Sequence, residues 1–257
     1  LDVKTARLSS LASQNFVAGR VYQNVLAESK VGAIFTSGNP SGDRNTLAGF
    51  DATYQTSRFR GSNNLLAGAW YVYNWNARTT GRHHGFGVKL DYPNDRWDIA
   101  TGYYYYGDAL EPGLGFLPRT GAQTCFFHVN YMPRPEKGSV GRLVRQFFHE
   151  FSAEYFWDLE GRLETRRLSV QPLSFQTESG EHFEFSLTPT RDVLPYDFEV
   201  ADGVVIPRGA YDFTSAEVEF RTAARRTVSA EVEHSFGDFY SGRLSQTELA
   251  LALKWRG

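Results

Sequence analysis

The sequence has no apolar run of 18 or more residues, so no segment of it reads as a membrane-spanning helix. It has a single cysteine, Cys125, which excludes an internal disulfide and a cysteine-based metal cage. Neither sign of charge dominates, because 27 Lys and Arg stand against 29 Asp and Glu, giving a formal net charge of −2. No bulk field therefore favours nucleic acid or an anionic surface.

Motifs that carry chemistry are also missing. There is no G-x-S-x-G, no P-loop and no G-x-G-x-x-G followed by a helix. His149-Glu150 begins like a zinc-protease helix, but Ala153 occupies the position of the second histidine. The adjacent His83 and His84 read as a solvated pair rather than as metal ligands. We therefore predict no enzyme activity, no cofactor and no metal site.

What the sequence does contain is strict alternation of apolar and polar side chains. The alternation is clearest in 214–221, 228–233 and 248–255. In the first of these ranges, Val218 and Phe220 alternate with Glu217 and Glu219. Alternation with a period of two places the two sets on opposite faces of a strand. One face of such a strand suits an apolar medium and the other suits water. The high aromatic fraction of 15% and the 24 glycines fit a turn-rich β chain.

Similar segments recur along the chain and predict about 13 consecutive antiparallel strands, with no amphipathic helix. Pro172 interrupts one of them, where we expect a bulge. Three longer connectors are predicted, at 108–121, 133–141 and 189–211. The other segments that read as strands are 15–26, 30–37, 46–57, 65–76, 84–92, 97–107, 125–131, 144–159, 162–177 and 181–188.

Connection lengths separate the two ends of this meander, because short turns alternate with longer loops. This asymmetry is typical of outer-membrane barrels, which have short periplasmic turns and long extracellular loops. Aromatic residues near strand ends suit the girdles of such a barrel. A β-sandwich or soluble barrel is the alternative, but the apolar faces are spread evenly over about a dozen strands. The aromatic residues near strand ends are Tyr54, Trp75, Tyr92, Trp97, Tyr131, Trp157 and Trp255.

The predicted fold class is thus all-β: an antiparallel, up-and-down transmembrane β-barrel. About 13 strands are visible, and we expect 14 to 16 in the complete barrel, because single-chain bacterial barrels have even numbers. Either the count is off by one or strands are missing at one or both ends. We expect 1–14 to be a linker or frayed strand and 15–257 to be the barrel. No signal peptide is recognisable at Leu1, which suggests a mature protein or a fragment.

The polar faces predict a charged lumen. Its carboxylates form either a mutually paired, solvated wall or an acidic eyelet that favours cations. We expect loop 108–121 to fold inward and constrict the lumen, because apolar side chains on a long loop are better buried than exposed. Loop 189–211 is a second candidate plug or docking surface. The predicted lumen residues are Asp51, Lys89, Asp91, Glu150, Glu154, Glu184, Glu217, Glu219, Arg221, Glu231, Glu233, Glu248 and Lys254, and the constriction residues are Leu114, Phe116, Leu117, Arg119, Val205, Ile206 and Arg208.

Several loop sequences resemble one known family. VGAIFTSGNPSGDRNTLAGFDATY (31–54), EPGLGFLPRTG (111–121), EGRLETRRLSV (160–170), GVVIPRGAYDF (203–213) and GDFYSG (237–242) are similar, in this order, to the DUF5916 family. The resemblance implies the barrel of a bacterial outer-membrane protein that often carries an N-terminal carbohydrate-binding family 9-like domain. That domain is absent from this sequence, so its sugar binding is not carried over. The family supplies no catalytic motif.

Two functions follow as hypotheses. The first is a passive pore for small polar solutes, and the second is a plugged barrel that anchors a periplasmic domain or a partner complex at the outer membrane. A soluble β protein that binds a hydrophobic ligand is a third, weaker alternative. The partners we expect are the lipid bilayer and periplasmic or membrane proteins, with no nucleic acid, and the expected location is the bacterial outer membrane.

Overall fold

Most of the described residues lie in strands. The structure is a computed structural model, and it describes residues 15–117 and 119–255. Residues 1–14, for which we expected a linker or frayed strand, lie outside the described residues. In this part of the chain no helix is long and apolar enough to cross a membrane.

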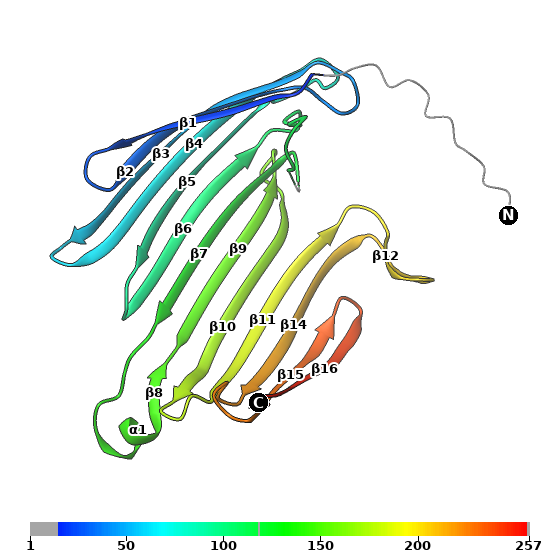
Figure 1. The fold of residues 1–257 in the computed structure, drawn as a ribbon. Coiled ribbons are helices and arrows are strands. Elements are labelled where there is room, and N and C mark those ends of the chain that lie inside the picture. The colour runs from blue at the N-terminus through cyan, green and yellow to red at the C-terminus, as the bar shows by residue number, and fades with distance from the viewer. Residues whose placement is uncertain (1–14, 118, 256–257) are drawn as a thin grey trace, which may run out of the picture. The chain divides into compact units, whose positions relative to one another are not determined.

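The strands form an antiparallel, up-and-down sheet in which sequence neighbours pair (Figure 1). This confirms the all-β, up-and-down prediction. The order begins at β1 and ends at β16, which are not paired with each other, so the sheet is open within the described residues. The strands on this path are β1 (Val17–Val25), β2 (Ser29–Ser37), β3 (Asn45–Phe59), β4 (Asn63–Asn76), β5 (His84–Pro93), β6 (Trp97–Tyr106), β7 (Ala122–Tyr131), β9 (His149–Asp158), β10 (Leu163–Thr177), β11 (His182–Leu194), β14 (Gly209–Arg221), β15 (Val228–Phe239) and β16 (Gly242–Leu253).

Two regions depart from the predicted strands. The long strand expected at 144–159 is two strands, β8 (Val144–Phe147) and β9, which both pair with β10. A short helix, α1 (Gly138–Leu143), precedes β8 where we expected no helix. Within the expected loop 189–211, β11 continues to Leu194, and β12 (Phe198–Ala201) and β13 (Val204–Ile206) form a separate hairpin. Each difference depends on which backbone groups bond to one another, and the periodicity of the side chains does not report that bonding.

The bulge expected at Pro172 is present. The register of β10 against β11 shifts between Val170 and Leu173. Proline has no backbone N–H to donate to a ladder, so a register shift is the way a strand accommodates it. On either side of this shift the pairs stay in register, with Val170 opposite Leu187 and Ser174 opposite Glu184.

The chain divides into two compact units. Of the described residues, one unit comprises 15–54 with Gly68–Gly87 and Tyr105–Ala122, and the other comprises Gln55–Ala67, Val88–Tyr104 and residues 123–255. Among the residues that the structure describes, neither unit has a large apolar core. The buried hydrophobic residues in the described part of the chain are Leu47, Ala109, Leu110, Ala122, Ala153, Ile206 and Ala223.

Candidate lumen face and its loops

A row of carboxylates crosses four strands on the polar face of the second unit. Glu184 of β11 lies opposite Glu219 of β14, Glu219 lies opposite Glu233 of β15, and Glu233 lies opposite Glu248 of β16. Side chains of directly opposed residues share one face. Like charges in that position destabilise a sheet by about 0.2–1 kcal/mol per pair. The row therefore does not stabilise the sheet by itself, and it gives this face a concentrated negative charge.

Neighbouring side chains offset part of this charge. Arg221 Nε lies 2.5 Å from Glu219 Oε1, and His182 Nε2 lies 3.5 Å from Glu184 Oε2. Ser235 Oγ donates to Glu217 Oε2 at 3.1 Å, next to the row. The only cation among these contacts with a permanent charge is the Arg221 guanidinium, so the row remains acidic.

Other predicted lumen residues in this unit form separate pairs. Glu150 Oε1 lies 3.5 Å from His128 Nδ1, and Glu154 Oε2 lies 3.4 Å from Arg167 Nη1. Lys89 Nζ lies 2.6 Å from Asp91 Oδ2. Glu231 lies opposite Arg221. Lys254 follows the end of β16, and its Nζ donates to the Ala224 carbonyl. The structure thus brings the glutamates of β11 to β16 together and places the other charged residues in local pairs.

In the first unit, Asp51 is paired across an intervening strand. Its Oδ2 lies 2.9 Å from Nη2 of Arg20 on β1, although β2 lies between β1 and β3. Gly32 of β2 lies directly opposite Asp51, and a Cβ on Gly32 would come within 2.9 Å of Asp51 Oδ2. The glycine leaves the space through which the carboxylate reaches the arginine.

Two buried asparagines attach the connector after β6 to the strands of the first unit. Asn74 is 0% exposed, and its Nδ2 donates to Asn45 Oδ1 at 2.7 Å and to the Thr46 carbonyl at 3.2 Å. Asn45 Nδ2 donates to the carbonyl of Glu111 at 2.7 Å, and the Gly113 amide donates to Asn45 Oδ1 at 3.0 Å. The Glu111 amide donates to Asn74 Oδ1 at 3.2 Å. These bonds hold the loop against β3 and β4.

Packing supports the same attachment. Ala109 and Leu110 are 1% and 2% exposed. Leu110 Cδ2 lies so close to Gly85 that a Cβ there would come within 2.7 Å of it, and Trp70 lies beside it. Asn45 and Asp51 lie six positions apart on β3 and therefore share a face, so the loop lies on the face that carries Asp51.

The side chains expected to constrict the lumen are less buried than their neighbours. Phe116 is 88% exposed, Leu114 and Leu117 are half-buried, and Arg119 is exposed. The burial expected for Phe116 is therefore not found, whereas Leu110 of the same loop packs against the strands. Constriction of a lumen by this loop remains a prediction.

The second candidate loop, between β11 and β14, makes its own small structure. The β12–β13 hairpin leaves Val205 52% exposed and buries Ile206 to 7%. The Arg208 amide donates to Asp197 Oδ1 at 2.8 Å, which closes the base of the hairpin. The apolar side chains expected to plug a lumen thus mostly face away from contacts in the described residues.

Sequence reasoning missed another polar cluster, at the β15–β16 turn. Tyr240 donates its hydroxyl to Asp192 Oδ2 at 2.7 Å, and Thr165 Oγ1 donates to Asp192 Oδ1 at 2.9 Å. Burial, together with the bond to Asp192, raises the pKa of Tyr240 to about 12. The missed asparagines had a weak signal, since Asn is depleted in strands and yet Asn45 begins β3 and Asn74 lies two residues before the end of β4.

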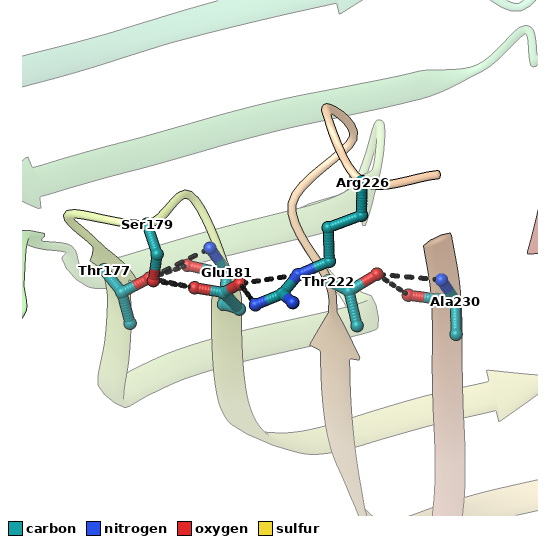
Figure 2. A network of polar contacts seen from close by, with 6 residues as sticks. All are labelled: Thr177, Ser179, Glu181, Thr222, Arg226 and Ala230. Atoms are coloured by element: carbon teal, nitrogen blue, oxygen red, sulfur yellow. Dashed lines mark hydrogen bonds and ion pairs between the residues drawn. The ribbon is translucent and has the colours of Figure 1, made fainter. Parts of the chain in front are cut away.

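A network of hydrogen bonds between the β10–β11 and β14–β15 turns centres on Glu181 (Figure 2). Thr177 Oγ1 donates to Glu181 Oε2 at 2.7 Å, and Arg226 Nε donates to Oε1 at 3.0 Å, with Ser179 also donating to Oε2. Hydrogen bonds from Ser179, Thr177 and Arg226 hold the pKa of Glu181 well below its usual value. The carboxylate therefore links the β10–β11 turn to the β14–β15 turn.

Residues 15–117 and 119–255 contain no group of three or more His, Cys, Asp or Glu side chains that could hold a metal ion. Comparison with known proteins gives no relative: no protein family, no curated protein and no solved structure matches this chain.

Proposed function

We propose that this chain forms an outer-membrane β-barrel that acts as a passive pore for small polar solutes. The observation that carries this proposal is the uncovered apolar face of β14 to β16. Leu249 and Leu251 are 64% and 68% exposed, and Phe220 is 43% exposed. Large contiguous apolar surfaces are rare on soluble monomers. A lipid bilayer is the medium that suits this face.

The opposite face supports a water-filled interior. The row of Glu184, Glu219, Glu233 and Glu248 alternates with the apolar residues along the same strands. Rings of carboxylates favour cations in pores. In a barrel of 14 to 16 strands the interior is too wide for side chains to fill, so this face would meet water. Closure would also remove the free edges of β1 and β16, which otherwise invite pairing with other chains.

The resemblance to DUF5916 belongs to the same proposal. The resemblance implies a barrel in a bacterial outer membrane, with the lipid bilayer and periplasmic or membrane proteins as the partners we propose. Residues 15–257 would form the barrel, and the longer loops would lie outside the cell.

A second candidate function is a plugged barrel that anchors a periplasmic domain or partner. It is favoured by the hydrogen bonds that fix the connector after β6 on the polar face of β3 and β4. A loop held by Asn45 and Asn74, both buried, is attached too firmly to be an open flap.

Single-channel recording in planar lipid bilayers at neutral and acid pH separates the two functions. We expect discrete, cation-selective current steps for the pore, weaker at acid pH because the carboxylates become protonated. A variant with Glu219, Glu233 and Glu248 changed to Gln should conduct with reduced cation preference. A folded barrel that gives no current would contradict the pore and leave the plugged anchor.

A further inference from the structure

Two arginines from neighbouring strands lie directly opposite each other in the second unit. Arg166 of β10 is paired in register with Arg191 of β11, and Arg191 is paired with Asp212 of β14. Directly opposed residues share a face, so these three side chains form one cross-strand row. Like charges in directly opposed positions are unfavourable unless another group compensates them.

The row lies on the apolar face of the sheet. Arg166 is four residues from Val170 with no register shift between them, and Val170 lies opposite Phe151 and Leu187. Arg191 is likewise four residues from Leu187. At about 3.3 Å per residue, the arginine row lies about 13 Å from this apolar row along the strands. Charged groups thus mark one end of an otherwise apolar surface.

A single carboxylate serves both guanidinium groups. Arg191 Nη1 lies 2.5 Å from Asp212 Oδ2, and Arg166 Nη2 lies 3.7 Å from Asp212 Oδ1. Arg166 Nε is buried without a hydrogen-bond partner among the described residues. The Arg166 and Arg191 side chains remain 37% and 38% exposed. The row therefore carries a net positive charge and more N–H donors than its one aspartate can accept, since each guanidinium has five.

Aromatic residues mark the same level of the sheet. Tyr155 of β9 lies directly opposite Arg166. Its ring stacks on Trp157, with the two centroids 5.5 Å apart. Tyrosine and tryptophan gather where a membrane protein crosses the interface between hydrocarbon and water. Lipid headgroups lie at this level of a bilayer.

We propose that Arg166 and Arg191 form a binding site for the phosphate group of an anionic membrane lipid. The planar guanidinium fork matches phosphate oxygens in a bidentate manner, and two forks side by side suit one phosphate. Asp212 competes with the phosphate for the same donors. This inference rests on the proposed function, because only a lipid-facing apolar surface brings the row to a headgroup.

The alternative is that Arg166, Arg191 and Asp212 form a structural ion triad that binds no ligand. A phosphate site and a structural triad predict different effects of Asp212→Asn on phosphate binding. Without the carboxylate, a phosphate site loses its internal competitor and binds phosphate more tightly. A structural triad loses its counter-ion and gains no ligand.

The test uses the folded protein in neutral detergent micelles, titrated with phosphatidylglycerol and followed by native mass spectrometry. The double variant Arg166→Gln with Arg191→Gln should bind phosphatidylglycerol about 10-fold more weakly, the loss expected for charge-assisted hydrogen bonds. Asp212→Asn should bind it several-fold more tightly. Arg167→Gln is the matched control, because Arg167 is the next residue, lies on the other face and contacts Glu154 at 3.4 Å. It should bind as the unmodified protein does.

A parallel titration with inorganic phosphate identifies the source of the ligand. Competition at millimolar phosphate would show that the phosphate group alone suffices, and absence of competition would show that the acyl chains on the apolar face are also needed. Equal lipid binding by the folded double variant and the unmodified protein would overturn the site, as would no gain with Asp212→Asn. A protein that does not insert into lipid at all would instead overturn the proposed function.

Discussion

The two long connections, between β6 and β7 and between β11 and β14, are held in place in different ways. The loop between β6 and β7 is attached to strands by the buried side chains of Asn45 and Asn74. The loop between β11 and β14 pairs with itself as the β12–β13 hairpin and exposes most of its apolar side chains, including Tyr196 at 71%. Buried amides tie a loop to the sheet, whereas a self-paired hairpin satisfies its backbone without the sheet.

The difference predicts unequal stability. A buried amide network is costly to disturb, because removal of one member leaves the others unpaired in a site that excludes water. An exposed hairpin contributes few buried contacts, so it opens locally at little cost. The loop after β6 should therefore unfold with the sheet, and the β12–β13 hairpin should unfold independently of it.

The largest expected effect comes from Asn74→Leu. The change leaves the Thr46 carbonyl and the Glu111 amide without their partners. We expect a loss of about 2–4 kcal/mol, since each buried unpaired group costs about 1–3 kcal/mol. Urea unfolding in detergent micelles measures the loss, and protease cleavage between 108 and 121 should become faster. Asn24→Leu, at an exposed position on β1, is the control. Equal stability of the two variants would contradict the amide anchor.

We expect an intermediate loss of stability from Glu181→Gln. This loss should depend on pH, because Glu181 is charged, whereas the Asn45 and Asn74 amides are neutral. The pKa of Glu181 is lowered by folding, so its stabilising contribution is complete above the unfolded value of 4.5. The contribution is lost as pH falls from there through the folded value. Thermal unfolding of the protein and of Glu181→Gln should thus differ most at neutral pH and converge in strong acid. A difference that is constant from neutral pH to strong acid would argue against the ionised carboxylate as the link.

The smallest effect should follow replacement of Phe198–Val205, which leaves the buried Ile206 in place, by Gly-Ser-Gly. The hairpin is mostly exposed, so the free energy of unfolding should change by less than about 1 kcal/mol. Urea unfolding under the same conditions as for Asn74→Leu gives the comparison. A loss as large as that of Asn74→Leu would show that the hairpin and the sheet form one cooperative unit.

Much of the fold could be predicted from periodicity. Alternation at period two located the strands and their two faces, because each side chain's face depends only on its own position. Pro172 predicted the register shift of β10 for an equally local reason. The split of 144–159 and the extension of β11 to Leu194 could not be read in this way, since both depend on the backbone hydrogen bonds that the neighbouring strands supply.

The candidate lumen face could be predicted in part, because alternation shows which side chains of a strand share a face. Alternation predicts that the glutamates of β11 to β16 share one face, and the strand register aligns Glu184, Glu219, Glu233 and Glu248 in one row. Register across four strands is not visible in any one of them. The bond between Asn45 and Asn74 joins residues 29 positions apart, so no local pattern could report it.

The most direct test of the central claim compares two adjacent residues on opposite faces of β15. Val232→Cys and Glu233→Cys, each in a Cys125→Ser background, are labelled with an environment-sensitive fluorophore and reconstituted into lipid vesicles. We predict that nitroxide-bearing lipids quench the label at Val232 and that aqueous iodide quenches the label at Glu233. Quenching of both labels by iodide, with no effect of the nitroxide lipids, would contradict a lipid-facing apolar surface.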